Sequence, residues 1–364
     1  RDKLVTGVQT CALPICKGHE ACDQWADLTI TMAQVLSGKE VSQEIRNEIA
    51  ARVKEVQVQH PSFKPGLAIV QVGDREDSNV YIKQKLKAAE EVGIDAQHIK
   101  LPKSTTQHEL VALIEKLNSD IKVDGMIVQL PLQSDHAIDT ETVLNTITAR
   151  KDVDGLHADN SGKLCRGELN DCIVPCTPRG CFELIKKTGI EVKGKRALVI
   201  GRSKIVGMPM ANLLTWHHAT VTIAHSRTVN MEQLVGEADI LVVATGQTEM
   251  VKGAWVKQGA VVIDCGINSV PDATKKSGKR LVGDVEYAPA KERASWITPV
   301  PGGVGPMTVA MLLSNTLDSA CRTLKDVATA GSSWKITNLP LHLKEPVPSD
   351  IEIALSQTDR KSVV

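Results

Sequence analysis

The sequence has no excess charge of either sign and no long block of like charges. Its 43 lysine and arginine residues balance 43 aspartate and glutamate residues over 364 residues. Because nonspecific binding to nucleic acid or to a membrane surface depends on clustered positive charge, we expect neither as the main partner. No stretch approaches the ~18 consecutive apolar residues that a membrane span needs. The sequence therefore predicts a soluble protein that acts on small molecules.

Paired cysteines are also lacking. The nine cysteines are an odd number, and no two of them form a Cys-x-x-Cys motif. This pattern is typical of reduced thiols in a cytosolic protein rather than of a disulfide framework. Cys172, Cys176 and Cys181 lie close together in the sequence, but their spacing matches no zinc motif and no histidine pair with zinc spacing follows. We therefore predict no metal site.

Internal repeats and low-complexity segments are absent, and the length suits about two domains of ~100–200 residues each. From residue 32 onward, apolar strands and amphipathic helices alternate, which predicts an α/β fold with parallel sheets. Thr106-Gln-His-Glu109 is typical of a capping box that opens a helix. Thr177 followed by Pro178 predicts another helix start. Further helices are expected at 41–56, 78–92 and 307–324, and strands at 67–72, 94–100, 125–132, 196–200, 220–224 and 261–264.

Residues 195–209, KRALVIGRSKIVGMP, combine a strand, a tight turn and a helix start. Gly201 ends the apolar run, while Gly207 and Pro209 mark the opening of the helix. Backbone N–H groups in such a turn and at a helix N-terminus attract phosphate, which favours dinucleotide binding. Arg202 and Ser203 stand where Gly-x-Gly-x-x-Gly has its second glycine, so an ordinary strand-to-helix turn stays open as an alternative.

Tyr81 and Lys85 lie four residues apart and therefore share one face of the helix expected at 78–92. Lys85 is placed beside the apolar stripe of this helix, and partial desolvation of an ammonium group favours proton transfer. A surface lysine whose charge reaches solvent is the alternative. Tyr-x-x-x-Lys also occurs in short-chain dehydrogenases, but there the pair follows the glycine-rich turn, whereas here it precedes Gly201.

Two further polar residues lie where ligands are often bound. Gln129 lies near the carboxyl end of an expected strand, which is the edge at which open parallel sheets bind ligands. Asp154, in Lys-Asp-Val-Asp-Gly, lies in a loop just beyond the first domain. Each also has an ordinary interpretation, an amide that faces a turn for Gln129 and plain Asp-Gly turn chemistry for Asp154.

The order of these motifs along the chain is more specific than any one of them. The motifs are Tyr81-x-x-x-Lys85, Val-Gln129-Leu-Pro-Leu, Lys-Asp-Val-Asp154-Gly, Gly201-Arg-Ser-x-x-Val-Gly-x-Pro and Pro-Gly-Gly-Val-Gly-Pro-Met-Thr308. Together they closely resemble the methylenetetrahydrofolate dehydrogenase/cyclohydrolase family, from Met32 to about Leu324. Residues 334–355 resemble the linker and opening of a formate–tetrahydrofolate ligase domain, as in the trifunctional C1-tetrahydrofolate synthases. No Gly-x-x-x-x-Gly-Lys-Ser/Thr loop occurs, so ligase activity is not expected.

The resemblance implies a two-domain α/β fold with a cleft between the domains. Residues 32–150, completed by a helix at 306–325, would form a folate-binding catalytic domain, and residues 151–305 a Rossmann-type NADP-binding domain. The implied reactions are NADP-dependent oxidation of 5,10-methylenetetrahydrofolate and hydrolysis of the methenyl product to 10-formyltetrahydrofolate. The resemblance further implies a role in one-carbon metabolism and purine biosynthesis, in a cytoplasmic homodimer without nucleic acid or membrane partners.

The resemblance also implies roles for single residues. Tyr81 is expected to stack on the aminobenzoyl ring of the folate, and Lys85, assisted by Gln129, to transfer protons. Asp154 is expected to hold the donor-rich edge of the pterin, to which a carboxylate can make two hydrogen bonds. Further folate contacts are implied for Ser78, Val128, Leu130, Pro301, Gly302, Gly303, Val304 and Gly305. Cofactor contacts are implied for Gly201, Arg202, Ser203, Ser226, Arg227 and Ile267.

The strand expected at 220–224 favours NADP over NAD as the cofactor. It is followed by His225-Ser226-Arg227, with no acidic residue to bind a ribose 2′-hydroxyl group. Arg202 and Arg227 are instead suited to a 2′-phosphate.

Two other functions stay open from the sequence. One is a sensor that binds folate or dinucleotide without catalysis, although the presence of both Lys85 and Asp154 favours an enzyme. The other is a two-domain dehydrogenase of hydroxy acids, which would need a histidine base. His217 and His218 lie in polar contexts without a carboxylate partner, and we interpret them as surface or loop residues.

Both ends of the sequence differ from the family pattern. Residues 5–15 resemble the translation of a short-read sequencing adapter, and residues 359–364 resemble another. We therefore interpret residues 1–31 as an extension outside the family sequence. Residues 331–358 are interpreted as the linker and start of a truncated ligase domain, and residues 359–364 as an adapter-derived tail.

Deleting residues 1–31 and 359–364 together is expected to leave the melting temperature and both activities unchanged, because neither segment has a patterned apolar face to bury. Calorimetry and activity assays of the shortened chain check this. A fall of several degrees in melting temperature would refute the adapter interpretation.

Overall fold

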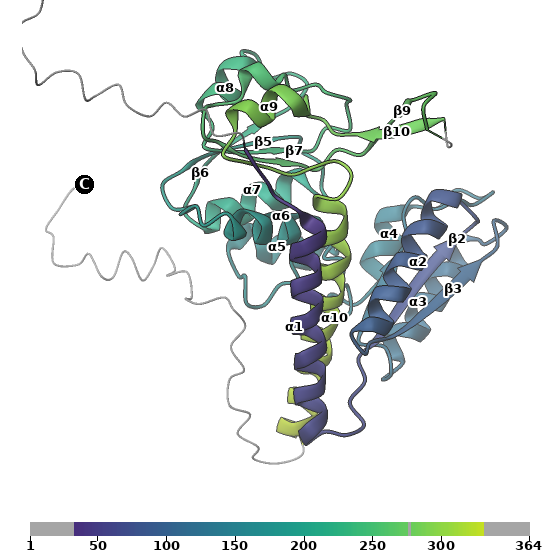
Figure 1. Cartoon of the computed structure of the whole chain (residues 1–364). Helices are drawn as coiled ribbons and strands as arrows, with labels where there is room; N and C mark the ends of the chain where they lie inside the picture. Colours follow the sequence, from purple (N-terminus) through teal and green to yellow (C-terminus); the bar gives the residue numbers. More distant parts are fainter. Residues whose placement is uncertain (1–32, 276–277, 331–364) are drawn as a thin grey trace, which may run out of the picture. The chain divides into compact units, whose positions relative to one another are not determined.

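The computed structural model of the protein describes residues 33–275 and 278–330. The interpretations of residues 1–31, 331–358 and 359–364 concern segments outside these ranges. Within the described residues, strands and helices alternate along the chain (Figure 1), as the sequence predicts. None of the helices in these ranges is long and apolar enough to cross a membrane.

A three-stranded parallel sheet forms the first layered core. Its strand order is β3-β2-β4, and the central strand is buried at every residue, as expected for a parallel sheet covered on both faces. Leu67 and Ile69 of β2 face a core shared with α1, α2 and α10, whereas Ala68 and Val70 face α3 and α4. The bounds are α1 Gly38–Gln59, β2 Gly66–Val72, α2 Glu76–Glu91, β3 Asp95–Leu101, α3 Gln107–Ser119, β4 Gly125–Val128, α4 Thr140–Thr146 and α10 Val304–Ala330.

A six-stranded parallel sheet forms the second layered core, with strand order β1-β11-β8-β7-β5-β6. Ala197 and Val199 of β5 face α6 and α7, and Leu198 and Ile200 face α8 and α9. The first described strand, β1, therefore pairs in this sheet and not in the three-stranded one. The bounds are β1 Gln34–Val35, α6 Cys176–Lys187, β5 Arg196–Ile200, α7 Gly207–Trp216, β6 Thr220–Ala224, α8 Met231–Glu237, β7 Ile240–Val243, β8 Val261–Asp264, α9 Tyr287–Arg293 and β11 Trp296–Ile297.

Four smaller elements complete the second part of the chain. Helix α5 packs on α7, and β9 and β10 form an antiparallel hairpin beside the six-stranded sheet. A short 3-10 helix, η1, packs against α9. Their bounds are α5 Ala158–Arg166, η1 Gly253–Trp255, β9 Asn268–Pro271 and β10 Lys279–Val282.

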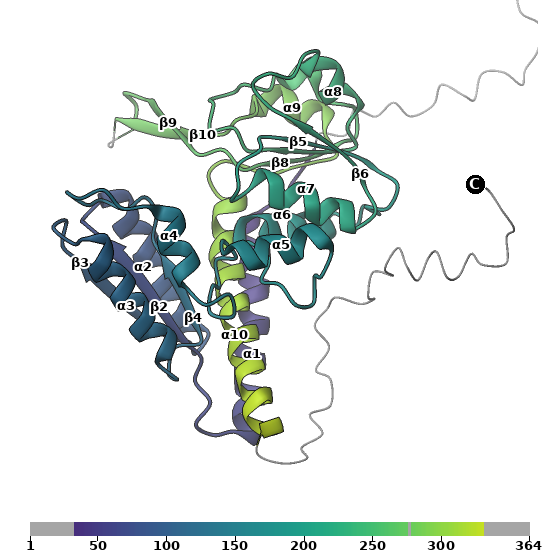
Figure 2. The same ribbon diagram turned by 180° about the vertical axis from the view of Figure 1, so that it is seen from behind.

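Helix α10 contributes side chains to a core of each sheet. Val304 and Met307, at its start, belong to the core between α6, α7 and the six-stranded sheet. Leu313 and Leu317, further along, belong to the core between α1, α2 and the three-stranded sheet. Figures 1 and 2, seen from opposite sides, both show α10 lying alongside α1.

Local sequence signals predict where the elements lie, but several of their ends differ from the predicted bounds. The capping box of α3 is formed as predicted by Thr106 and Glu109. The strand expected to reach residue 132 ends at Val128, because Pro131 has no N–H group to continue the ladder. Helix α6 begins one residue before Thr177, whose hydroxyl contacts Thr308 instead of capping the helix.

Helix α10 also begins earlier than the predicted residue 307, at Val304. Pro306 lies in its first turn, where backbone N–H groups have no partner within the helix and a proline is tolerated.

Two buried carboxylates hold together the loops at the carboxyl end of the six-stranded sheet. Asp264, at the end of β8, accepts hydrogen bonds from the N–H groups of Gly266 (2.8 Å), Asp284 (3.0 Å) and Val285 (2.9 Å). Asp284 in turn accepts hydrogen bonds from the backbone N–H groups of Thr245 (2.7 Å) and Gly246 (2.9 Å). The loops that follow β7 and β8 are therefore fixed relative to each other.

Burial raises the pKa of Asp264 to about 6 from its ordinary 3.8, against the opposing effect of the three N–H donors. Because the folded protein binds this proton more tightly than the unfolded chain, the resulting stability is fully present below about pH 4 and is lost as the pH rises through about 6. A pKa difference of this size corresponds to roughly 3 kcal/mol.

We therefore expect the free energy of unfolding to fall more steeply between about pH 4 and pH 7 in the wild-type protein than in Asp264→Asn, by up to roughly 3 kcal/mol over the interval. Urea denaturation of both proteins across this range measures the difference. Parallel pH profiles would contradict the assignment.

Candidate active site

A pocket of about 270 Å³ is formed by residues from both layered cores. The first core contributes α2 and the loop after β4, and the second contributes the turn after β5 and the loop after β8. Helix α10 and the segment that leads into α6 complete the wall. The lining residues are Tyr81, Lys85, Val128, Gln129, Leu130, Asp154, Leu156, Pro175, Cys176, Thr177, Ile205, Val206, Ile267, Gly305, Thr308 and Val309.

Lys85 and Gln129 are in direct contact in this pocket. The Lys85 ammonium donates a hydrogen bond to Gln129 Oε1 at 2.9 Å. Gln129 Nε2 donates to the backbone carbonyl of Leu130, also at 2.9 Å. Since a carbonyl can only accept and an ammonium can only donate, these two contacts fix the orientation of the Gln129 amide. Lys85 is therefore held at a defined point by a neutral acceptor.

Asp154 lies in the same pocket, with the buried thiol of Cys176 beside it. Burial, and next the negative charge of Asp154, raise the pKa of Cys176 well above its ordinary value, while the Lys85 ammonium opposes the shift. The Cys176 thiol donates to the carbonyl of Val153 at 3.3 Å. Cys176 is therefore a neutral part of the wall, within electrostatic reach of both charged groups.

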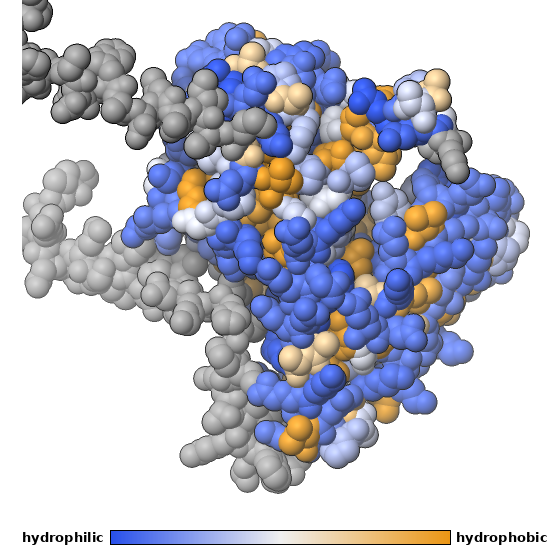
Figure 3. Space-filling model, in the orientation of Figure 1, coloured by the Kyte–Doolittle hydropathy of each residue, from blue (hydrophilic) through white to orange (hydrophobic). Residues whose placement is uncertain are grey.

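Exposed apolar side chains lie at the mouth of this pocket. Tyr81, Ile205 and Ile267 are 41, 48 and 47% exposed, although each is large and apolar. The face of the molecule seen in Figure 3 is mostly hydrophilic, with small groups of apolar residues. Apolar groups that line a concave site containing a few polar residues are typical of a ligand pocket.

A second cavity, of about 620 Å³, opens at the carboxyl ends of β5, β6 and β7. Gly201 has a φ of 118°, and a Cβ there would lie 2.2 Å from the carbonyl oxygen of Ala244. A Cβ on Gly207 would lie 2.1 Å from the carbonyl oxygen of Gly201, so only glycine permits this tight turn into α7. The lining residues are Ile200, Gly201, Arg202, Ser203, His225, Ser226, Thr228, Met231, Ala244, Thr245, Gln247, Met250 and Trp255.

Comparison with known proteins identifies this arrangement. The family model for the catalytic domain of tetrahydrofolate dehydrogenase/cyclohydrolase matches residues 36–154, and the model for its NAD(P)-binding domain matches residues 175–324. The chain belongs to the tetrahydrofolate dehydrogenase/cyclohydrolase family. It is therefore an enzyme of this dehydrogenase/cyclohydrolase class, as the sequence predicts, with a nicotinamide dinucleotide as cofactor.

Individual relatives agree with this assignment. The cytoplasmic C-1-tetrahydrofolate synthase of Rattus norvegicus is 59% identical over 324 residues, which make up 89% of this chain and 34% of that protein. The chain thus spans about a third of the length of the curated relatives it matches.

Solved structures match nearly along their whole length. The methylenetetrahydrofolate dehydrogenase-cyclohydrolase of Trypanosoma brucei, solved with NADP and an inhibitor, is 41% identical with a TM-score of 0.77, covering 81% of this chain and 99% of that one. The bifunctional enzyme of Campylobacter jejuni is 42% identical with a TM-score of 0.75, covering 80 and 99%. The predicted two-domain α/β fold is thereby confirmed.

The structure of this dehydrogenase/cyclohydrolase family member brings together many, but not all, of the residues expected at the folate site. Ser78 is 4% exposed and does not line the pocket. Of residues 301–305, only Gly305 lines it. A Cβ on Gly38 would lie 1.7 Å from the carbonyl oxygen of Gly303, so this loop packs tightly on the start of α1. Residues 301–304 thus lie outside the lining of this pocket.

The residues expected to contact the cofactor do not all line the same cavity. Gly201, Arg202, Ser203 and Ser226 line the second cavity, whereas Ile267 lines the first pocket and Arg227 lines neither.

Sequence reasoning missed Cys176, Thr177 and Thr308 as pocket residues. The hydroxyl groups of Thr177 and Thr308 lie 3.1 Å apart, across the contact between α6 and α10. Thr308 ends the glycine-rich motif, and its place within a motif was the signal available. Cys176 and Thr177 gave no such signal, because only tertiary packing places the start of α6 beside α10.

His217 lies in the turn that follows α7, within the surface or loop setting that the sequence predicts, but its surroundings there are partly apolar. Its ring packs on Phe182 with a centroid distance of 4.0 Å, and Nδ1 lies 2.8 Å from the Leu213 carbonyl oxygen. Burial lowers the pKa of His217. Within the described residues no histidine lines the pocket of about 270 Å³ that contains Lys85 and Asp154. A hydroxy-acid dehydrogenase with a histidine base therefore has no support from this pocket.

Proposed function

We propose that this chain oxidises 5,10-methylenetetrahydrofolate to the methenyl compound with NADP and then hydrolyses that compound to 10-formyltetrahydrofolate. The observation that carries the proposal is the Lys85–Gln129 contact of 2.9 Å, in a pocket that also holds Asp154. The turn after β5 contributes Ile205 to this pocket and Arg202 to the second cavity. Both ligands would therefore meet along one turn.

Two residues would bind and orient the folate. Tyr81, at the mouth of the pocket, offers an aromatic face for the aminobenzoyl ring. Asp154 offers two carboxylate oxygens to the N–H groups of the pterin edge. When Tyr81 and Asp154 hold the folate at its two ends, the one-carbon unit lies between these two residues, near Lys85. Such orientation is most of what the oxidation step requires from the chain.

The residues around the second cavity fit a dinucleotide. The Gly201 turn leaves backbone N–H groups at the start of α7 free to approach a phosphate, because no Cβ intervenes. Gly201, Arg202, Ser203 and Ser226 would hold the cofactor. When bound, NADP supplies the oxidising power for the first reaction.

The hydrolysis step depends on Lys85 more than the oxidation step does. Water must add to the methenyl carbon, and the bond from that carbon to N5 must then break. The water oxygen loses both of its protons, of which one reaches N5 and the other is released to solvent. Lys85 carries the group that would move these protons. Gln129 holds the Lys85 ammonium by a single neutral acceptor, so the lysine is positioned without being neutralised by a carboxylate. A sensor without catalysis has no use for this arrangement, and a turnover assay separates the two functions.

We also propose that the chain acts in the cytoplasm as a homodimer, in the one-carbon metabolism that supplies purine biosynthesis. The mammalian relatives, which are named as cytoplasmic enzymes, support the location. Folate derivatives are its proposed partners, and nucleic acids and membranes are not.

Lys85→Met keeps the length of the side chain and removes the ammonium. We expect it to reduce cyclohydrolase activity by about 10²–10⁴-fold, the usual contribution of a general acid or base, and to harm the dehydrogenase less. Tyr81→Ala should weaken folate binding and lower both activities together. Both rates are measured on each variant.

Lys87→Met, at an exposed position on the same helix, is the matched control and should change neither rate. Full cyclohydrolase activity in Lys85→Met, or an equal loss of both activities, would show that the role assigned to Lys85 is wrong.

Cofactor preference tests the second cavity. Hydrogen bonds to a charged phosphate are worth roughly 1.5–3 kcal/mol, so NADP should be preferred over NAD by about tenfold or more. Arg202→Ala should raise the KM for NADP by about that factor and leave the KM for NAD unchanged. Arg227→Ala, outside the cavity lining, should have the smaller effect. Equal catalytic efficiency of the wild-type chain with NAD and NADP would be incompatible with this assignment.

A further inference from the structure

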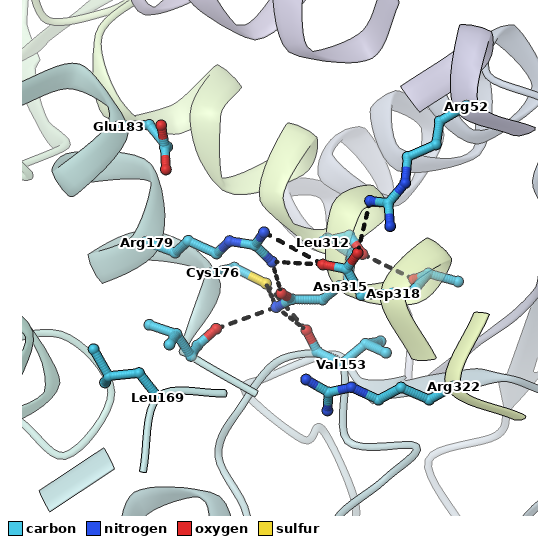
Figure 4. Close-up of polar contacts among 12 residues, drawn as sticks. Arg52, Val153, Leu169, Cys176, Arg179, Glu183, Leu312, Asn315, Asp318 and Arg322 are labelled. Carbon is cyan, nitrogen blue, oxygen red and sulfur yellow. Dashed lines mark hydrogen bonds and ion pairs between the residues drawn. The ribbon is translucent and has the colours of Figure 1, made fainter. Parts of the chain in front are cut away.

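Asn315 lies in the middle of α10, is 3% exposed and joins the backbone segments that contain Val153 and Val174 (Figure 4). Each segment continues into residues that line the pocket of about 270 Å³. Its Nδ2 donates to the carbonyl of Val153 at 2.8 Å and to the carbonyl of Val174 at 3.1 Å. The same nitrogen lies 3.6 Å from Cys176 Sγ. Its Oδ1 accepts a hydrogen bond from Arg179 Nη1. Every hydrogen-bonding atom of this amide is therefore engaged.

The contacts leave the Asn315 amide only one orientation. The two carbonyl oxygens can only accept, so the amide nitrogen must face them. The Arg179 guanidinium can only donate, so the amide oxygen must face it. A carboxylate of the same size would place an oxygen against the carbonyls of Val153 and Val174, and an apolar side chain would leave both carbonyls without this donor.

An ion-pair network holds Arg179 in place for this contact. Asp318, one turn further along α10, lies 3.3 Å from Arg179 Nη2 and 3.0 Å from Arg52 Nη1. Figure 4 shows Arg52 and Arg179 approaching Asp318 from α1 and α6. The side chain of Asp318 is 12% exposed, so the network is largely shielded from solvent. Arg179 is thereby aimed at Asn315.

The two segments joined by Asn315 also press against each other. Gly155 has a φ of 74°, and a Cβ there would lie 2.6 Å from Pro175 N and 2.7 Å from the Ile173 carbonyl oxygen. Asp154 belongs to one segment, and Cys176 follows the other. Asn315 itself does not line this pocket. It lines a separate cavity of about 490 Å³ on the other side of the wall.

We propose that Asn315 is a positioning residue for the folate site: its amide clamps the backbone beside Asp154 to the backbone that leads into α6. The inference rests on the proposed function, because it assigns Asp154 to the pterin. Asn315 acts through the main chain, so its removal displaces the Asp154 carboxylate without removing any group that touches the substrate. The turn that lines the dinucleotide cavity lies on other elements and is not held by this clamp.

Asn315→Asp and Asn315→Leu test the clamp, and Ser319→Ala is the matched control. Ser319 lies one turn further on α10, is 4% exposed, and its hydroxyl contacts two backbone carbonyls, those of Asp124 (2.7 Å) and Arg150 (2.8 Å). Both Asn315 variants should lower kcat/KM for methylenetetrahydrofolate by up to about 10²-fold, a typical result of misplacement near 1 Å. The KM for NADP should stay unchanged. Ser319→Ala should lower the melting temperature while sparing both constants.

Amide hydrogen exchange provides a readout that does not depend on activity. Faster exchange in peptides covering residues 152–157 and 173–177, in the Asn315 variants alone, supports the clamp. Equal exchange in all proteins overturns it. The positioning role is overturned if the Asn315 variants lower kcat/KM for methylenetetrahydrofolate and raise the KM for NADP to a similar extent. It is also overturned if they lower only the melting temperature, as expected for Ser319→Ala. Absence of turnover in the wild-type chain refutes the proposed function instead, and the exchange comparison still decides whether Asn315 fixes the two segments.

Discussion

Burial of one helix by two different sheets is the constraint on which the rest of this structure depends. A parallel sheet must be covered on both faces, because its strands are apolar at successive residues. Helix α10 covers part of the three-stranded sheet through Leu313 and Leu317, while Val304 and Met307 pack with α6 and α7. The loops between these elements are therefore brought to one place. The pocket that contains Lys85 and Asp154 lies where α10, the start of α6 and the end of β4 meet.

Hydrogen bonds between polar groups at this meeting point fix the orientations of side chains. The Gln129 amide is oriented by the Leu130 carbonyl and holds Lys85, and the Asn315 amide is oriented by Arg179 and holds the Val153 carbonyl. Burying an amide whose hydrogen-bond partners are all in place costs little free energy, whereas burying one without partners is strongly destabilising. Each amide therefore tolerates a single arrangement, which favours accurate placement of the charged groups beside it.

Much of the site could be recognised from local sequence. Lys85 lies four residues after Tyr81 on one helix, and Gln129 lies at the end of an apolar strand, so spacing predicts the helix face and the sheet edge on which they lie. The order of the motifs along the chain was needed to favour a ligand site over a surface lysine and a turn amide. The tight turn at Gly201 is also a local property, since it depends on a glycine at a positive φ. Ser78 and residues 301–304 were expected at the folate surface because of their motifs. In the structure these residues do not line the pocket that contains Lys85 and Asp154, and their contact with folate stays a prediction.

The sequence by itself determined the alternation of strands and helices, the capping box of α3, the glycine turn and the family to which the ordered motifs belong, because each depends on neighbours within a few residues or on the order of motifs. Only the tertiary structure decided that Cys176 and Thr177 line the pocket, that His217 packs on Phe182, and that Asn315 joins Val153 to Val174. Asn315 and Val153 are 162 residues apart. Contacts over such separations are set by how α10 packs between two cores, and no local pattern of residue types records that packing.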